Sequence, residues 1–382
     1  MELESLVVHG GATDISGLVQ DLTLFESIEG YVQGSIHVID GDNFFDKVIG
    51  AKDTLVPITL TFTYMDIEVT YFFQADGISN MMINKSNKEY NIHLITLVEQ
   101  GLKLVPINAA FSGASHEIAA GIFEEALADV GPYLYVDSKA ITTGKYIVPN
   151  ISARDALENV VDGAMDIHST GFYIYQRVVD GGKTRMGSLK HMAGNKFMKG
   201  PREEFAIRGE IISNESSEAP GDNIDTIGTS NKFTVLEYKR NFTDKIVDGE
   251  FGNKIHSVSL DETTVVKNQA LEASAHVQTV YKSSNNLYNT EKNLFATVND
   301  PESSMSVNQM ARIHHTRLSV RDLSAIPTIG CGMSVNIELG GQENSASISD
   351  GIYIISDINH IMTFNGKNYE YKQHMTLIRE YA

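Results

Sequence analysis

The chain has 382 residues, 42% of them hydrophobic, and its 49 acidic and 30 basic side chains give a formal charge of −19. This length exceeds the usual limit for one hydrophobic core, so we expect two to four packing units. The acidic balance argues against a protein that wraps nucleic acid, because phosphate contacts require clustered Lys and Arg. The negative charge is compatible with a channel wall that repels DNA and does not bind it. The alternative is that the net charge only keeps the protein soluble.

Membrane insertion is not expected, because no segment approaches the ~20 apolar residues that a membrane helix requires. The acidic start, Met1–Ser5, lacks the basic and apolar regions of a secretory signal, so we expect synthesis in the cytoplasm. The single cysteine, Cys331, excludes an intramolecular disulfide and a multi-cysteine zinc site. Flanked by two glycines, Cys331 is either a nucleophile or, as is commoner, a small buried residue in a strand or turn.

The first hundred residues alternate with the period of β-strands. Leu22–Ile28 and Tyr31–Ile39 flank Glu29-Gly30 and predict a hairpin. A polar turn is predicted at 84–88. Further strands are predicted at 57–63, 69–75 and 89–98. Short strands joined by polar turns are typical of a small antiparallel barrel.

The pattern then changes to helices and a second hairpin. Ser115 is predicted to cap one helix, and Ser152 with Asp155 forms a variant of the capping box that opens another. The predicted apolar stripes of these helices are Ile118, Ile122, Ala126 and Leu127 in the first, and Ala156, Leu157, Val160, Val161 and Ala164 in the second. The strands predicted at Gly171–Val179 and Thr184–Met192 flank the turn signal Asp180-Gly181-Gly182-Lys183.

Two polar stretches interrupt the remaining strands. Residues 213–230 predict an exposed loop, and residues 283–308, rich in Ser, Asn and Thr, predict a long connection that is mobile unless a partner holds it. Strand patterns occur at 233–238 and 254–260.

The last seventy residues repeat the organisation of the first hundred. Ser334–Leu339 corresponds to Ile58–Phe62, and Gly351–Ile358 corresponds to Tyr71–Ile78. After a turn, Tyr369–Glu380 with His374 and Thr376 parallels Glu89–Glu99 with His93 and Thr96. Chance similarity between two β-meanders is the alternative explanation. Two similar barrels per chain would give a closed trimer six barrels around one axis, which adapts threefold to sixfold symmetry without a catalytic residue.

No catalytic, cofactor-binding or metal-binding residues are predicted. His314 and His315 are adjacent, and on a strand they point to opposite faces. Gly181-Gly182-Lys183-Thr184 resembles the end of a phosphate-binding loop, but Arg177 stands where that loop needs glycine, so the hairpin is favoured. No Gly-x-Ser-x-Gly motif occurs. The remaining strand-like histidines are expected to pack or to form hydrogen bonds: His9, His37, His93 and His374.

Carboxylates are numerous, so residue type alone does not exclude a glycosidase pair, although nothing places two of them at a suitable separation. The lack of tryptophan argues against carbohydrate binding. Several acidic residues near strand ends either line a central channel or are ordinary surface charge: Glu26, Glu29, Asp40, Asp42 and Asp46.

The order of segments resembles the central hub proteins of T-even-type phages. The stretches that carry the resemblance are LTLFESIEGYVQGSIHVID (22–40), SARDALENVVDGAMD (152–166), GFYIYQ (171–176) and GIYIISDINHIMTFNGKNYEYKQHMTLI (351–378). The resemblance implies an α+β, predominantly antiparallel fold with two small barrels per chain, assembled as a pseudo-sixfold homotrimeric ring. It also implies that the ring joins a hexameric tail tube to a trimeric spike among baseplate wedge proteins, and that DNA passes through without specific binding.

On this basis the expected domains are a first barrel at 1–104, an α+β insert at 105–200, and a second barrel built from 201–262 and 312–382. Residues 263–311 are expected to form an excursion that is flexible or ordered by a partner. The expected function is structural and non-enzymatic, with no cofactor, in the virion tail. The rivals are a hub or spike of a DNA-free contractile injection or type VI secretion system, and a cell-wall hydrolase.

Overall fold

The computed structural model describes residues 3–49, 56–64, 66–83, 87–128, 133–167 and 170–194, then residues 328–339, 351–379 and the further strands named below. The predicted loop at 213–230, the connection predicted at 283–308 after its first residue, and the pair His314-His315 lie outside the described residues. No helix in the described part of the chain has the length and apolar character needed to cross a membrane.

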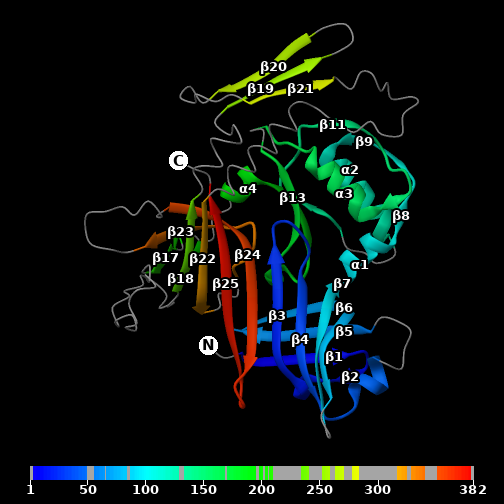
Figure 1. Ribbon diagram of the computed structural model, residues 1–382, viewed down its shortest axis with the longest axis vertical. Helices are drawn as coiled ribbons and strands as arrows, with labels where there is room; N and C mark the ends of the chain where they lie inside the picture. Colours follow the sequence, from blue (N-terminus) through cyan, green and yellow to red (C-terminus); the bar gives the residue numbers. More distant parts are fainter. Residues whose placement is uncertain are drawn as a thin grey trace.

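Thirteen of the described strands form one large sheet, antiparallel at almost every pairing. Its main path runs through β18 (Thr234–Arg240), β22 (Thr316–Ser324), β25 (Tyr369–Arg379), β24 (Gly351–Phe364), β3 (Val19–Ser27), β4 (Gln33–Asp40), β7 (Lys88–Thr96), β6 (Ile67–Ile83), β5 (Pro57–Tyr64), β1 (Ser5–Gly10) and β2 (Thr13–Asp14). A side branch, β23 (Ser334–Leu339), pairs with β24 and, in parallel, with β17 (Ala206–Gly209). In Figure 1, β24, β3 and β4 stand side by side, whereas β5 and β6 cross beneath them at a steep angle.

Two groups of five strands in this sheet share one order. The sequence β5-β6-β7-β4-β3 in the first half matches β23-β24-β25-β22-β18 in the second, and every neighbouring pair is antiparallel. Both groups carry an irregularity at the same point, between Ala75 and Gly77 in β6 and between Ile355 and Asp357 in β24. These four residues occupy matching places in the correspondence predicted between Tyr71–Ile78 and Gly351–Ile358.

The predicted correspondence of the last strand is out of register. Leu377 lies opposite Ile355, as Leu94 lies opposite Ala75, so Thr376 takes the place of His93 instead of that of Thr96. The alignment assumed a strand that continues to Val98, but β7 ends at Thr96.

The two five-strand groups are joined edge to edge by pairing between β24 and β3. β18 and β2, the ends of the path, do not pair with each other, so the described pairings form an open sheet without a closed barrel. In the first group β3 pairs with β24 and β5 pairs with β1, so these two end strands do not pair with each other to close a barrel.

Helices and small sheets lie between the two groups in sequence. The helices are α1 (Leu97–Leu104), α2 (Ser115–Leu127), α3 (Ala153–Asp162) and α4 (Leu189–Gly194), with short turns η1 (Ser16–Leu18), η2 (Phe45–Ile49) and η3 (Val178–Asp180). The small sheets pair β8 (Pro106–Ile107) with β12 (Ile151–Ser152), β9 (Ala110–Ala114) with β11 (Thr143–Ile147), and β15 (Met198–Gly200) with β16 (Glu203–Glu204). A three-stranded sheet contains β10 (Tyr135–Val136), β14 (Thr184–Ser188) and β13 (Phe172–Gln176). The fold is therefore α+β and mostly antiparallel β.

A separate sheet contains β19 (Gly252–Val258), β20 (Thr263–Ala270) and β21 (Gln278–Ser283). β19 was expected in the second barrel, and β20 and β21 lie in the segment expected to be an excursion. In the structure β19 pairs with both of them.

Hydroxyl side chains end two predicted strands early. Thr96 accepts a hydrogen bond from the backbone N–H of Glu99 at 3.3 Å and caps α1. Ser188 accepts from the N–H of His191 at 3.2 Å, where α4 begins. The strands predicted to reach Val98 and Met192 were thus too long, because these hydroxyls satisfy the free N–H groups of a first helical turn.

The two predicted helix caps have different outcomes. Ser152 caps α3 as predicted, accepting from the N–H of Asp155 at 3.1 Å. Ser115 lies inside the first turn of α2 and donates to the carbonyl of Thr142 instead. The N–H of Ala114 donates to the carboxylate of Glu117, which holds the start of α2.

Four apolar clusters form the core. One fills the first strand group, one lies among the helices, and one fills the second strand group. The fourth brings β13 and α4 against β24 and β25, with Tyr175, Leu189, Cys331 and Ile354 among its members. This fourth cluster surrounds the polar junction described next.

Candidate functional site

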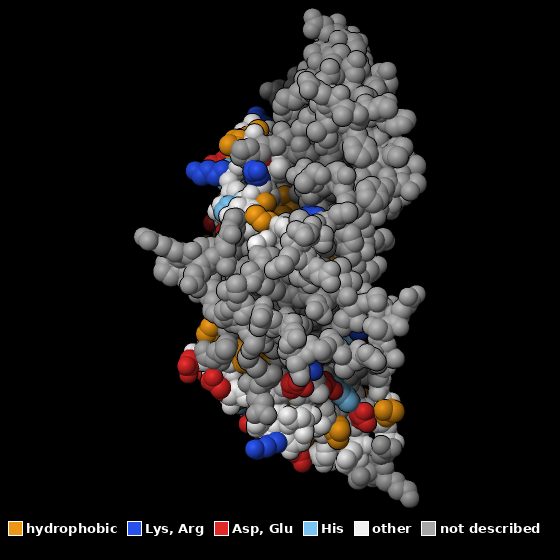
Figure 2. Space-filling model, turned by 90° about the vertical axis from the view of Figure 1, so that its left-hand side faces the viewer, with side chains coloured by type: hydrophobic (Ala, Val, Ile, Leu, Met, Phe, Trp, Pro, Cys, Tyr) orange, Lys and Arg blue, Asp and Glu red, His pale blue; other side chains and the backbone are white. Residues whose placement is uncertain are grey.

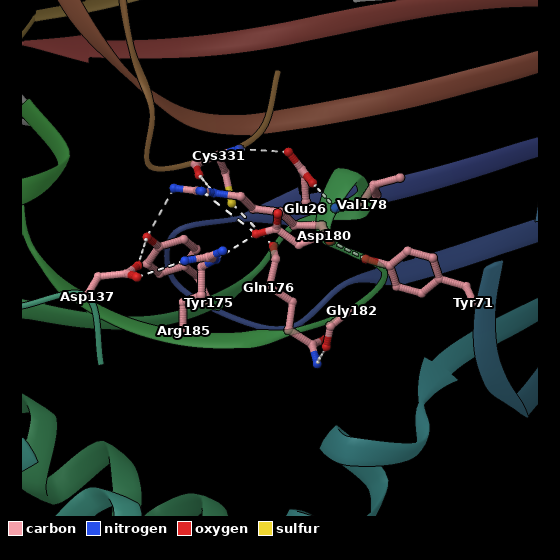
Figure 3. A network of polar contacts seen from close by, with 11 residues as sticks. Glu26, Tyr71, Asp137, Tyr175, Gln176, Val178, Asp180, Gly182, Arg185 and Cys331 are labelled. Atoms are coloured by element: carbon pink, nitrogen blue, oxygen red, sulfur yellow. Dashed lines mark hydrogen bonds and ion pairs between the residues drawn. The ribbon is translucent and has the colours of Figure 1, made fainter. Parts of the chain in front are cut away.

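Glu26 is the centre of a buried polar junction. It lies on β3 two residues after Leu24 and therefore on the same inward face. One carboxylate oxygen accepts from the N–H of Cys331 at 2.7 Å and the other from the N–H of Val178 at 2.5 Å (Figure 3). This fully buried side chain thus joins the first strand group, the β13–β14 hairpin and the turn before β23.

Arg177 supplies positive charge to the same junction. Its Nε donates to the carbonyl of Cys331 at 2.7 Å and its Nη2 to the hydroxyl of Tyr175 at 3.2 Å. Its Nη1 lies 3.8 Å from the carboxylate of Asp180. Because Arg177 is almost fully buried, these contacts offset the cost of removing its charge from water.

A second arginine extends the network toward the helices. Arg185 donates to Asp180 at 2.6 Å and to Asp137 at 2.7 Å, and the hydroxyl of Tyr175 donates to Asp137 at 3.0 Å (Figure 3). Burial lowers the pKa of Arg185, but the bond to Asp180 and the charge of Asp137 outweigh it and hold the pKa above its usual value. The bonds of Arg185 fix the hairpin to Asp137, the residue that follows β10.

Gln176 and Tyr71 complete the connection to the first strand group. Gln176 accepts from the N–H of Val32 at 3.2 Å and donates to the carbonyl of Gly182 at 3.0 Å. Tyr71 donates to the carbonyl of Arg177. Gly181 and Gly182 have φ of 64° and 80°, which confirms that the Gly-Gly-Lys-Thr stretch is a turn between strands.

Cys331 has no access to a substrate. Burial, followed by the charge of Glu26, raises the pKa of its thiol well above the usual value, and the thiol donates to the carbonyl of Gln176 at 3.3 Å. A protonated, fully buried thiol is a poor nucleophile. The prediction of a small buried residue is confirmed, and the nucleophile alternative is wrong.

The contacts of this junction were not predicted from the sequence. Glu26 and Asp40 were candidates for a channel wall, but both are buried, and Asp40 instead accepts from the N–H groups of Phe44 and Phe45. The other three candidates, Glu29, Asp42 and Asp46, are exposed. The alternation Leu22-x-Leu24-x-Glu26 was the available signal, because it places Glu26 on the inward face.

Two strand histidines form the hydrogen bonds expected of them. His37 lies between Asp21, at 3.4 Å, and Glu89, at 3.0 Å, in a hollow of about 410 Å³ lined by β3, β4, β6 and β7. His93 contacts the hydroxyl of Ser79 at 2.7 Å. Within the described residues no group of three or more His, Cys, Asp or Glu side chains has the arrangement of a metal site.

Large apolar side chains are exposed at matching positions of the two strand groups. Phe72 on β6 is 59% exposed and Ile352 on β24 is 46% exposed, and both lie one residue before a buried aromatic side chain. Figure 2 shows acidic, basic and apolar side chains interspersed on the described part of the face that it draws. This part of the surface carries charge of both signs.

The fold is similar to solved structures of tail proteins. A tail protein from Neisseria meningitidis MC58 matches with a TM-score of 0.57 at 10% identity, over 98% of this chain and 96% of that chain. The 43 kDa tail protein of prophage MuSo2 from Shewanella oneidensis also matches with a TM-score of 0.57 at 10% identity, over 99% and 97%. The chain has the fold of phage tail proteins.

This fold extends to secretion systems. The E. coli c3393 protein is a component of the type VI secretion system with structural similarity to the T4 tail proteins gp27 and gp5. It matches with a TM-score of 0.54 at 7% identity, over 99% of this chain and 77% of that chain. The predicted resemblance is confirmed as a likeness of fold. No family model and no curated protein sequence matches the chain.

Proposed function

We propose that the chain is the structural hub of a phage tail baseplate, a homotrimeric ring between the hexameric tail tube and the trimeric cell-puncturing spike. The observation that carries the proposal is the repeated five-strand order, with its irregularity at the same place in both groups. Three chains with two equivalent modules each present six similar modules around one axis. Such a ring matches a sixfold partner on one face and a threefold partner on the other.

The proposed mechanism is mechanical and needs no catalytic residue or cofactor. The ring passes sheath-driven force from the tube to the spike, and its centre is a channel for DNA once the spike has left. The junction around Glu26 suits a part under load, because it ties the hairpin and both strand groups together through buried hydrogen bonds. The net charge of −19 keeps DNA from adhering to the wall.

The proposed modules keep the boundaries expected from the sequence except at β19, which forms a separate sheet with β20 and β21. Residues 1–104 form the first module, 105–200 the insert, and the remainder of 201–262 with 312–382 the second module. The excursion at 263–311 and the wedge proteins around the ring complete the proposed assembly.

The test is the mass and symmetry of the purified full-length chain. Light scattering at micromolar concentration is expected to give three times the chain mass of 42.0 kDa. Class averages of negatively stained particles are expected to show a ring with both threefold and sixfold components in its rotational power spectrum. A monomer or dimer, alone and after mixing with the tube and spike proteins, overturns the proposal.

The fold of the type VI secretion component favours one second candidate, a hub in a DNA-free contractile system. Immunogold labelling of particles from the producing cells separates the two. Label at the tail tips of DNA-filled particles supports the phage hub, whereas label on headless contractile tubes supports the second candidate.

A further inference from the structure

The two strand groups are joined inside the chain by one strand pairing. Asp357–Thr363 of β24 pair antiparallel with Ser27–Asp21 of β3. The earlier part of the same edge of β24 pairs with β23, and the opposite edge pairs with β25. This junction shows how the second group meets the first.

The strand segment in the first group that corresponds to β24, and the strand in the second group that corresponds to β3, have no such partner. The counterpart of the paired part of β24 is the end of β6 from Gly77, which extends beyond Gln74, the last residue paired with β5. The two strands match residue by residue as far as Ser79, where β6 has a second irregularity, between Ser79 and Met82, that β24 lacks. The counterpart of β3 is β18, which pairs with β22 on one side only. Among the described strands, neither free edge has a partner.

The free edge of β6 also carries exposed apolar side chains. Met82 is 55% exposed and Ile83 is 70% exposed, and Met81 beside them is also exposed. A long apolar edge with unpaired N–H and C=O groups recruits another strand, so soluble proteins cover or charge such edges. The side chains of this edge fit a site that is covered in the assembled protein.

We infer that β18 of one subunit pairs antiparallel with the end of β6, residues 77–83, in the next subunit, and that the pairing keeps the register of the β24–β3 junction up to Ser79. The inference rests on the proposed ring. It deepens the proposal by naming the strands that close the ring. In the strand order six strands separate β18 from β6, and Figure 1 shows β18 to the left of β24, β3 and β4. The two edges therefore do not pair within one chain, and a closed ring brings together the edges of neighbouring subunits.

The shared irregularity fixes the expected register. Asn359 lies two residues beyond Asp357, as Ser79 lies two residues beyond Gly77, and Asn359 pairs with Phe25. Phe25 of β3 lies opposite Gln33 in β4. The counterpart of Gln33 in the second group is Arg317 of β22, and the residue of β18 opposite Arg317 is Lys239. Lys239 is therefore the counterpart of Phe25. Ser79 of one subunit therefore lies opposite Lys239 of the next.

A cysteine pair tests this register in the full-length chain. Directly opposed residues of an antiparallel pair lie close enough for a disulfide, so the variant Ser79→Cys/Lys239→Cys is expected to form covalent dimers and trimers under mild oxidation. The matched control is Ser79→Cys/Tyr238→Cys, in which the second cysteine is shifted by one residue and points to the other face. At least fivefold less cross-linked product is expected from the control, and native Cys331 is buried in both.

A charge on the apolar edge provides a second test. Ile83→Asp is expected to raise the dissociation constant of the trimer at least tenfold. Ile167→Asp, at a site 75% exposed outside the large sheet, is expected to change it less than twofold. A trimer that neither forms the Ser79–Lys239 link nor weakens with Ile83→Asp overturns the inference and leaves the proposed function standing. A wild-type chain that never trimerises overturns both.

Discussion

Glu26 and Cys331 are 305 positions apart, yet the carboxylate of the first accepts the backbone N–H of the second. The same carboxylate accepts from Val178, so one buried side chain satisfies donors from two other segments. Glu26 and Arg177 are connected through the backbone of Cys331, whose N–H donates to Glu26 and whose carbonyl accepts from Arg177. A buried network of this kind is stabilising only when all its members are present.

Replacement of this carboxylate is expected to destabilise the protein strongly. Glu26→Ala leaves two buried N–H groups without their acceptor, at about 1–3 kcal/mol each, so we expect the free energy of unfolding to fall by about 3 kcal/mol or more. Urea unfolding measures the change. Glu68→Ala, an exposed glutamate on β6, is the control and is expected to stay within about 0.5 kcal/mol of wild type.

The thiol of Cys331 reports on the same variant independently. Burial raises the pKa of this thiol and shields it from solvent, so the native protein is expected to remain unreactive toward a disulfide reagent at pH 8. In urea one thiol per chain is expected to react. Glu26→Ala is expected to speed this reaction in the absence of urea. Equal unfolding free energies for the two glutamate variants, with an unchanged thiol rate, would show that the junction does not hold the segments together.

At the scale of elements, short polar side chains decide where strands give way to helices. Thr96, Ser188 and Ser152 each accept an N–H from a first helical turn. Only Ser152 was recognisable in sequence, because Asp155 follows at the spacing of a capping box. The apolar residues after Thr96 and Ser188 continue a strand pattern, so periodicity alone extends both strands too far.

The cap of α3 gives a prediction at this scale. Ser152→Ala removes the acceptor for the N–H of Asp155 and is expected to cost about 1 kcal/mol in thermal or urea unfolding. Ser152→Asp restores an acceptor and places negative charge at the helix N-terminus, so it is expected to recover most of the loss. A full loss with Ser152→Asp would mean that the hydroxyl acts through some other contact.

For the whole molecule, the sequence was informative where the pattern repeats locally. The first hairpin, the α3 cap and the turn at Gly181-Gly182 all depend on neighbours within a few residues. The junction around Glu26 was not predictable, because its partners come from segments far apart in the chain and leave no spacing to detect. Joining of the strand groups through β24 and β3 was missed for the same reason.

The repeat also predicts how the ring meets its partner. Phe72 and Ile352 are exposed at equivalent positions. In the proposed trimer they would present six apolar side chains in a nearly sixfold arrangement, which would match six sites on the proposed hexameric tube. Phe72→Asp and Ile352→Asp are each expected to weaken binding of the tube protein at least tenfold, measured by biolayer interferometry, while the mass of the trimer stays unchanged. Tyr133→Asp, at an exposed aromatic residue outside both strand groups, is the control and is expected to bind as wild type does. Weakening by only one of the two strand variants would mean that the tube contacts the modules unequally, which contradicts a sixfold contact through these residues.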